Sequence, residues 1–179
     1  MHRQQLEHII RAAAGITGAS EFVIVGSQSV LGQFPQAPDE LLVSIEADVF
    51  SLRDPADADL IDGSIGEGSP FHQTFGYYAH GVGQETAVLP AGWQERLVPV
   101  HNSNTGGGTG LCLEIHDLAV SKLVAGREKD VDFIGGLLRH RLAQAPVIRE
   151  RLTKTELSTD RRQTCLARLD RLIAAAANK

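Results

Sequence analysis

The sequence is poor in cysteine, in aromatic side chains and in long apolar runs. Its two cysteines, Cys112 and Cys165, make neither a metal-binding quartet nor a disulfide framework, which is typical of a reducing compartment. No apolar run approaches the ~18 residues of a membrane-spanning helix. The first eight residues, Met-His-Arg-Gln-Gln-Leu-Glu-His, lack the charged and then apolar pattern of a secretory signal. These features predict a cytoplasmic protein with no membrane partner.

The size and composition favour one compact domain, or a domain with a small helical appendage. The chain has 179 residues, of which 42% are hydrophobic and 22% charged. This mixture is too apolar for intrinsic disorder. We expect an α/β core over residues 1–116 and a helical C-terminal region over residues 117–179 that packs on it.

The charges are distributed unevenly along the chain. Residues 1–138 hold 18 acidic and 7 basic residues, whereas residues 139–179 hold 4 acidic and 10 basic residues. Nine of the acidic residues fall within 39–67, beside a single base, Arg53. A basic segment of this kind can contact RNA or can cap an acidic domain. Phe133 is the only aromatic residue after Trp93, which leaves little means of stacking on bases and favours the cap.

The hydrophobic spacing predicts an α+β fold, with a mixed sheet flanked by helices and a helical C-terminal region. The Asp-, Gly-, Ser- and Pro-rich residues 53–76 are expected to be a long irregular excursion. Asp117 is expected to cap the helix that follows it. The strands are expected at residues 21–25, 41–52, 77–82, 85–89, 97–101 and 111–115. The helices are expected near residues 6–13, 28–33, 118–126 and 130–142, from Pro146 and from residue 159 or 160.

Two short motifs could together hold a metal-bound nucleotide. Gly26 and Ser27 follow a predicted strand and offer backbone N–H groups and a hydroxyl to phosphate. Glu46 and Asp48 lie two residues apart in the next strand, so their side chains share one face about 7 Å apart. Two such carboxylates repel each other unless a cation such as Mg²⁺ lies between them. Taken singly, an acidic pair on a wet strand face and a Gly-Ser turn are both commonplace.

Lys122 lies on a predicted helix that is apolar around almost its whole circumference. Such a helix is expected to be buried, and an unpaired buried ammonium is costly. Lys122 therefore needs a nucleotide phosphate or a carboxylate as its partner, unless it extends to the surface along the helix.

Other chemically active side chains carry weaker signals. The histidines have no metal-like spacing and are expected to be structural or solvent-facing: His72, His80, His101 and His116. The run Gly106–Gly110 lacks the Lys-Ser/Thr ending of a phosphate loop and is expected to be a hairpin turn. Trp93 is expected to be a packing anchor.

Three segments together resemble the minimal nucleotidyltransferases of bacteria, and more narrowly an uncharacterised branch near the AbiEii-type toxins. The segments are Phe22-Val-Ile-Val-Gly-Ser-Gln-Ser-Val30, Ser44-Ile-Glu-Ala-Asp48 and the run from His116 to Asp130. Gly66-Glu-Gly-Ser-Pro-Phe-His72 and Val88-Leu-Pro-Ala-Gly-Trp93 also look like that branch. The resemblance covers roughly residues 20–142.

The resemblance implies a polymerase-beta-like fold and a role for six residues. Gly26 and Ser27 would hold the nucleotide phosphates, and Glu46 and Asp48 would hold Mg²⁺. Lys122 would contact the triphosphate, with Asp130 near the site in a supporting role.

Two departures from the family pattern leave two functions open. The usual first carboxylate is Asp, and here it is Glu46. Glu85 and Glu114 are the nearest strand-borne candidates for a third carboxylate, and neither fits a family pattern. The first interpretation is a Mg²⁺-dependent transfer of a nucleoside monophosphate from a nucleoside triphosphate to a protein, RNA or small molecule, in a toxin–antitoxin or defence setting with an antitoxin partner. The second is a degenerate member that binds nucleotide in a regulatory role.

Overall fold

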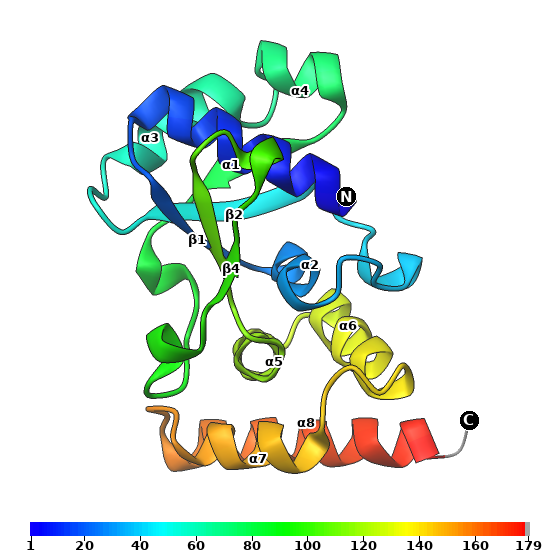
Figure 1. Cartoon of the computed structure of the whole chain (residues 1–179). Coiled ribbons are helices and arrows are strands. Elements are labelled where there is room, and N and C mark those ends of the chain that lie inside the picture. The colour runs from blue at the N-terminus through cyan, green and yellow to red at the C-terminus, as the bar shows by residue number, and fades with distance from the viewer. Residues whose placement is uncertain (178–179) are drawn as a thin grey trace.

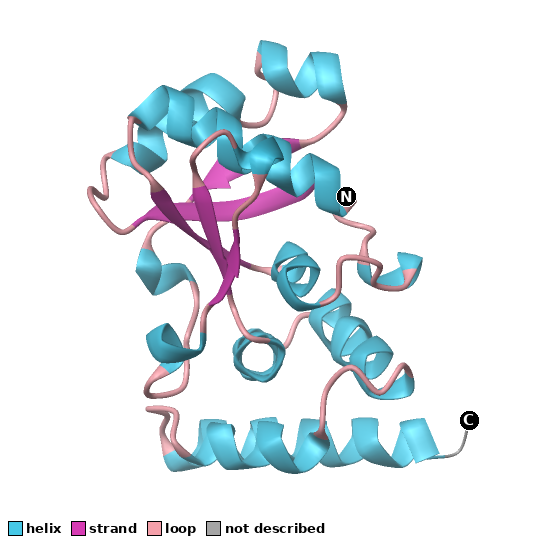
Figure 2. Cartoon of the chain, viewed as in Figure 1, coloured by secondary structure: helices cyan, strands magenta, loops and turns pink. Residues whose placement is uncertain are grey.

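A five-stranded mixed sheet forms the centre of the protein, in a computed structural model that describes residues 1–177 (Figure 2). The strand order is β3-β2-β1-β5-β4. Strands β1 and β5 run parallel, as do β2 and β3, while β1–β2 and β4–β5 are antiparallel. The strands are β1 (Glu21–Val25), β2 (Glu46–Ser51), β3 (Tyr78–Gly81), β4 (Val98–Val100) and β5 (Thr109–Cys112).

Helices cover both faces of the sheet (Figure 1). Helices α1, α3 and α4 lie on one side, and α2, α5 and α6 on the other, with α7 and α8 as an outer layer beyond α5 and α6. This arrangement confirms the predicted α+β class. None of the described helices combines the length and the apolar stretch needed to span a bilayer. The helices are α1 (Arg3–Thr17), α2 (Val30–Gln33), α3 (Asp57–Ile65), α4 (Pro70–Phe75), α5 (Ile115–Ala125), α6 (Glu128–Arg139), α7 (Ala145–Thr153) and α8 (Thr159–Ala177).

The pairing of the strands brings three chain segments to one end of the sheet. Asp48 lies opposite Val25 in the β1–β2 pair, so Asp48 is beside Gly26, the first residue after β1. In the β2–β3 pair, Glu46 lies opposite Tyr78 and Asp48 lies opposite His80. The register therefore gathers polar side chains of β2 and β3 beside the glycine that follows β1.

The prediction of an irregular segment at 53–76 is wrong, because two helices occupy most of it. Helix α3 has Asp57 and Asp59 in its first turn, where the helix dipole favours acids, and it buries Ile61 and Ile65 four residues apart. Helix α4 begins at Pro70, and the Ser69 side chain accepts a hydrogen bond from the His72 N–H. The polar composition reflects helix starts rather than a loop.

Three of the predicted strand assignments also differ from the structure. Residues 41–45 continue the alternating pattern, yet β2 begins only at Glu46, and Val43 is 79% exposed. The neighbouring strands pair only with residues from Glu46 onward, and a strand needs a partner. Residues 85–89 contain a short 3₁₀ turn, Gln84–Thr86, and no strand. The last strand, β5, lies two residues earlier than predicted and forms a hairpin with β4.

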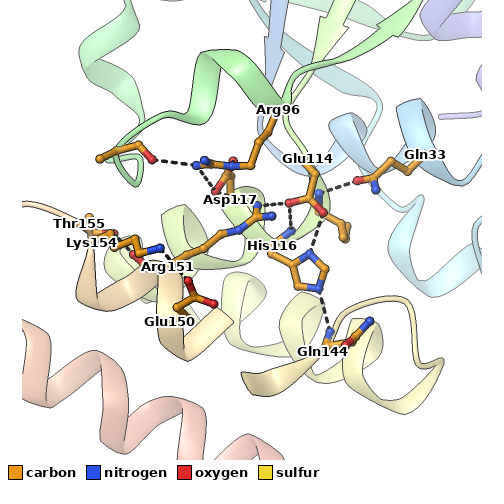
Figure 3. A network of polar contacts seen from close by, with 12 residues as sticks. Gln33, Arg96, Glu114, His116, Asp117, Gln144, Glu150, Arg151, Lys154 and Thr155 are labelled. Atoms are coloured by element: carbon orange, nitrogen blue, oxygen red, sulfur yellow. Dashed lines mark hydrogen bonds and ion pairs between the residues drawn. The ribbon is translucent and has the colours of Figure 1, made fainter. Parts of the chain in front are cut away.

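A buried polar network joins the sheet region to the outer helices (Figure 3). Glu114, not Asp117, caps α5, because its side chain accepts a hydrogen bond from the His116 N–H. Asp117 is instead fully buried and pairs with Arg96 at 2.8 Å and with Arg151 at 2.9 Å. Arg151 comes from α7 and also contacts Glu114. The network thus fixes α7 against α5.

Candidate functional site

A cavity of about 930 Å³ lies between the end of the sheet and helices α5 and α6. Its lining comes from four sources: strands β1, β2 and β3 with the turn that follows β1, the loop before β2, the 3₁₀ turn after β3, and one face of each of the two helices. On α5 the lining residues follow a helical repeat: Leu118, Ser121, Lys122 and Ala125. The cavity is therefore built from segments far apart in the sequence.

The sheet supplies an acidic wall to this cavity. Glu46 and Asp48 project from the same face of β2, and His80 projects beside them from β3. The His80 Nδ1 lies 3.1 Å from Glu46 Oε1 and 3.3 Å from Asp48 Oδ1. Tyr78 donates its hydroxyl to Glu46 Oε2 at 3.2 Å. Within residues 1–177, this is the one group of three metal-ligating side chains close enough to share an ion.

Burial and mutual charge shift the pKa values of the groups in the acidic wall. Burial, followed by the charge of Glu46 and a hydrogen bond with it, raises the pKa of Asp48 to about 6. Burial and the same carboxylates raise the pKa of Tyr78 to about 12. Burial alone would lower the pKa of His80, but the carboxylates of Asp62, Asp48 and Glu46 raise it. The protein thus concentrates negative charge at the end of β2, where a divalent cation would relieve the repulsion.

Gly26 allows the chain to pass against Asp48. Its φ of 73° lies in the region that favours glycine, and a Cβ there would come within 2.2 Å of Asp48 Oδ2. Ser27 begins the 3₁₀ turn Ser27–Ser29 and lines the cavity. The backbone at Gly26 therefore lies directly against the Asp48 carboxylate.

Helices α5 and α6 supply a cationic wall that faces the carboxylates across the cavity. Lys122 comes from α5, Arg127 and Lys129 from the start of α6, and Arg139 from its end. Glu40 and Asp132 also line this part of the cavity, and Arg139 is paired with Glu40 at 2.6 Å, so the cationic wall carries ion pairs as well. Cations close to a carboxylate pair suit a ligand that carries anionic groups and a metal ion together.

Lys122 is paired with a carboxylate, Asp130, which was one of the alternatives open from the sequence. Its Nζ lies 3.0 Å from Asp130 Oδ1, and its side chain is only 10% exposed. Asp130 is fully buried and also binds Arg127 through Nε at 2.6 Å. Burial lowers the pKa of Lys122, against the opposing effect of Asp130. Burial would raise the pKa of Asp130, but Arg127 and Lys122 lower it. Asp130 thus fixes both cations at the edge of the cavity.

The structure brings most of the sequence-predicted site residues together. Five of the six line the cavity, and Asp130 lies behind Lys122: Gly26, Ser27, Glu46, Asp48 and Lys122. Their assigned roles stay predictions. The two acids considered for a third carboxylate lie elsewhere, because Glu85 is in the 3₁₀ turn after β3 and Glu114 is in the α5–α7 network.

Sequence spacing does not mark His80 as a site residue. The signal exists only in the pairing of strands, because His80 lies opposite Asp48 once β2 and β3 are parallel neighbours. Arg127 and Lys129 belong to the segment 116–130 that resembles the family, but the resemblance assigns them no role. The junction between α5 and α6 places both at the cavity, where Arg127 feels the charges of Asp48 and Glu46.

Residues 4–163 match the family described as Nucleotidyltransferase of unknown function (DUF6036). The chain belongs to this family. A comparison with curated proteins and one with solved structures each found no match. The predicted nucleotidyltransferase family is confirmed at this level.

The donor atoms of the acidic wall suit a divalent cation, the kind of ion that the resemblance to minimal nucleotidyltransferases implies. Glu46, Asp48 and His80 each offer one donor atom, and these atoms all lie within 4.8 Å of one another. The Asp48 carboxyl has a raised pKa, in part because Glu46 repels its ionised form. A bound cation would offset this repulsion and favour the ionised form of both carboxylates. The residues could therefore hold a metal ion in the cavity.

Proposed function

We propose that this chain is a nucleotidyltransferase that uses a divalent cation, Mg²⁺ by the sequence prediction, to transfer a nucleoside monophosphate from a nucleoside triphosphate. The observation that carries this proposal is the cavity with carboxylates on one wall and cations on the other. Membership of the nucleotidyltransferase family supports it.

The proposed roles follow from where each group lies. Glu46 and Asp48 hold the metal, and the backbone at Gly26 with the Ser27 hydroxyl binds the β- and γ-phosphates. Lys122 offsets the negative charge that develops during transfer. Asp130 is a positioning residue, because it reaches the nucleotide only through Lys122 and Arg127.

The transfer itself is an in-line displacement. An acceptor oxygen forms a bond to the α-phosphorus, while the bond from that phosphorus to the bridging oxygen of the β-phosphate breaks. Pyrophosphate leaves with the electron pair, and the acceptor proton passes to solvent. The metal, when bound, neutralises charge on the phosphate oxygens.

Transfer of a labelled nucleotide tests the proposal. The wild-type protein, incubated with α-labelled nucleoside triphosphates, Mg²⁺ and a bacterial extract, is expected to label a macromolecule or small molecule. Asp48→Asn should reduce transfer by at least about 100-fold, since it removes half of the carboxylate pair. Asp59→Asn is the matched control, because Asp59 is exposed on α3 outside the cavity. Equal transfer by wild type and Asp48→Asn would contradict the proposal.

The same labelling experiment identifies the acceptor. Protein, RNA and small-molecule fractions separate after the reaction, and the fraction that keeps the label contains the acceptor. We further propose the toxin–antitoxin setting and the AbiEii-like branch, on the resemblance alone. Expression of the wild type in bacteria should then slow growth, and expression of Asp48→Asn should not; equal growth would argue against this setting.

A second candidate is a nucleotide-binding protein without transferase activity. It is favoured by one observation, the absence of a third carboxylate beside Glu46 and Asp48 among residues 1–177. Tight binding of a metal-bound nucleoside triphosphate, with no transfer to any fraction of the extract, would support this second function over the first.

A further inference from the structure

We infer that His80 is the third protein ligand of the divalent cation held by Glu46 and Asp48, and that this site therefore prefers Mn²⁺ over Mg²⁺. The inference rests on the proposed function, which it deepens by naming the cation. Nothing in the sequence spacing suggests it, because His80 lies 32 residues beyond Asp48.

The distances between donor atoms match those around a single ion. Ligands bound at about 2.1 Å and at right angles to each other are about 3 Å apart. The His80 Nδ1 lies 3.1 Å from Glu46 Oε1 and 3.3 Å from Asp48 Oδ1. Two of the three pairwise distances thus already match the spacing of neighbouring ligands, and all three donor atoms lie within 4.8 Å of one another, so an ion could bind them with small movements of the side chains.

The backbone holds His80 in this place. His80 and Asp48 are register partners in the parallel β2–β3 pair, so neither depends on a flexible loop. The next residue, Gly81, donates its N–H to Asp62 Oδ1 at 2.7 Å, which ties the end of β3 to α3. A Cβ on Gly81 would lie 2.1 Å from the Ala58 carbonyl oxygen, so β3 and α3 are in close contact here. The imidazole is therefore presented by a fixed strand.

The chemistry of the donors sets the expected preference. Mg²⁺ takes oxygen ligands almost entirely, and imidazole suits first-row transition ions better. Mn²⁺ accepts both carboxylate oxygen and imidazole nitrogen. The ratio of Mn²⁺ affinity to Mg²⁺ affinity should therefore be higher in a site with two carboxylates and one imidazole than in a site with three carboxylates. His80 is 50% exposed, so the remaining positions around the ion stay open to water and phosphate.

The alternative is that His80 acts only as a hydrogen-bonding counter-charge to the two carboxylates. It would then leave the cation preference unchanged. Two measurements on purified protein separate the possibilities without reference to activity. One is calorimetric titration with MnCl₂ and with MgCl₂, and the other is pulsed electron paramagnetic resonance of the Mn²⁺-loaded protein, which detects a coordinated ¹⁴N nucleus.

The variants are His80→Asp, which supplies a third oxygen ligand, and His80→Gln, which removes the imidazole. His101→Ala is the matched control, because His101 lies exposed next to β4, the opposite edge of the sheet from β3. We expect the wild type and His101→Ala to bind Mn²⁺ at least about tenfold more tightly than Mg²⁺ and to give a ¹⁴N signal. His80→Asp should lose the signal and bind Mg²⁺ more tightly, and His80→Gln should lose the signal and weaken Mn²⁺ binding by about tenfold.

The outcomes separate this inference from the proposed function. Metal binding with an unchanged Mn²⁺-to-Mg²⁺ ratio in His80→Asp, or a wild type without a ¹⁴N signal, would overturn the role of His80 and leave the proposed function standing. Failure of the wild type to bind either ion, even with a non-hydrolysable nucleoside triphosphate present, would overturn both.

Discussion

At the scale of single residues, the site depends on how closely Gly26 and Asp48 approach each other. Asp48 sits where β1 and β2 pair, and its carboxylate would collide with any side chain at position 26. The same closeness contributes to the burial that raises the pKa of Asp48 to about 6. A glycine is therefore needed for both the shape and the charge of the acidic wall.

Gly26→Ala tests this requirement. An alanine at a φ of 73° would strain the backbone, and its Cβ would displace Asp48 Oδ2. The variant should therefore bind Mg²⁺ at least about tenfold more weakly. Its free energy of unfolding should fall by about 1–3 kcal/mol. Calorimetry and urea unfolding measure the two effects. Gly15→Ala is the control, because Gly15 lies within α1 and an added Cβ there would meet no heavy atom within 4 Å outside its own stretch of helix. This change should raise the free energy of unfolding by about 0.5–1 kcal/mol. Unchanged Mg²⁺ binding in Gly26→Ala would contradict the close approach.

At the scale of elements, α5 connects the site to the outer helices. One of its faces lines the cavity with Ser121 and Lys122, and its first turn enters the network that holds α7 through Arg151. Burial alone would raise the pKa of Glu114, but the hydrogen bond from His116 and the charges of His116 and Arg151 lower it to about 2. The ionised form of Glu114 therefore stabilises the folded state.

This network predicts a specific dependence of stability on pH. A carboxyl group with a depressed folded-state pKa contributes stability above its unfolded-state pKa and loses it as the pH falls through the folded-state pKa. The contribution of Glu114, about 2–3 kcal/mol, should be complete above about pH 4.5 and lost by about pH 2. Urea unfolding of wild type and Glu114→Gln from pH 7 to pH 2.5 measures it.

The expected result is that Glu114→Gln is less stable at pH 7 and that its difference from wild type shrinks as the pH falls. Glu156→Gln is the control, since Glu156 is an exposed residue between α7 and α8. A difference that stayed constant from pH 7 to pH 2.5 would show that Glu114 stabilises the fold by packing alone.

The elements also show what sequence patterns could and could not predict. Strand β1 follows from a continuous apolar run, because it is buried on both faces, and helix α6 follows from apolar residues at helical spacing. Helices α3 and α4 do not follow from composition, because their polar residues serve as helix starts, which composition does not separate from loops. Residues 41–45 are wrongly predicted as strand because alternation says nothing about whether a neighbouring strand is present.

The site was predictable to a similar, partial degree. Gly26 with Ser27 and Glu46 with Asp48 are two short-range motifs, so the sequence places the members of each pair together, and the β1–β2 pairing then brings the two pairs side by side. His80 depends on a long-range strand pairing, and Arg127 depends on the angle between α5 and α6. Neither feature has a local signal in the chain.

At the scale of the whole molecule, the uneven charge distribution has a structural counterpart. Acids of the first part of the chain and bases of the last part meet in ion pairs, as in Arg139 with Glu40 and Arg151 with Asp117. The layer formed by α7 and α8 lies over α5 and α6, so it covers the helices that supply the cationic wall (Figure 1). These contacts favour a helical cap over an RNA-binding tail.

The central claim is that the cavity binds a nucleoside triphosphate through a divalent cation. Calorimetric titration with a non-hydrolysable ATP analogue, with and without Mg²⁺ or Mn²⁺, tests it most directly, with other nucleoside triphosphate analogues in parallel. We predict binding that strengthens at least about tenfold when either cation is present and that loses this gain in Asp48→Asn but not in Asp59→Asn. Binding of equal strength with and without the cations, or no binding of any analogue, would contradict the account.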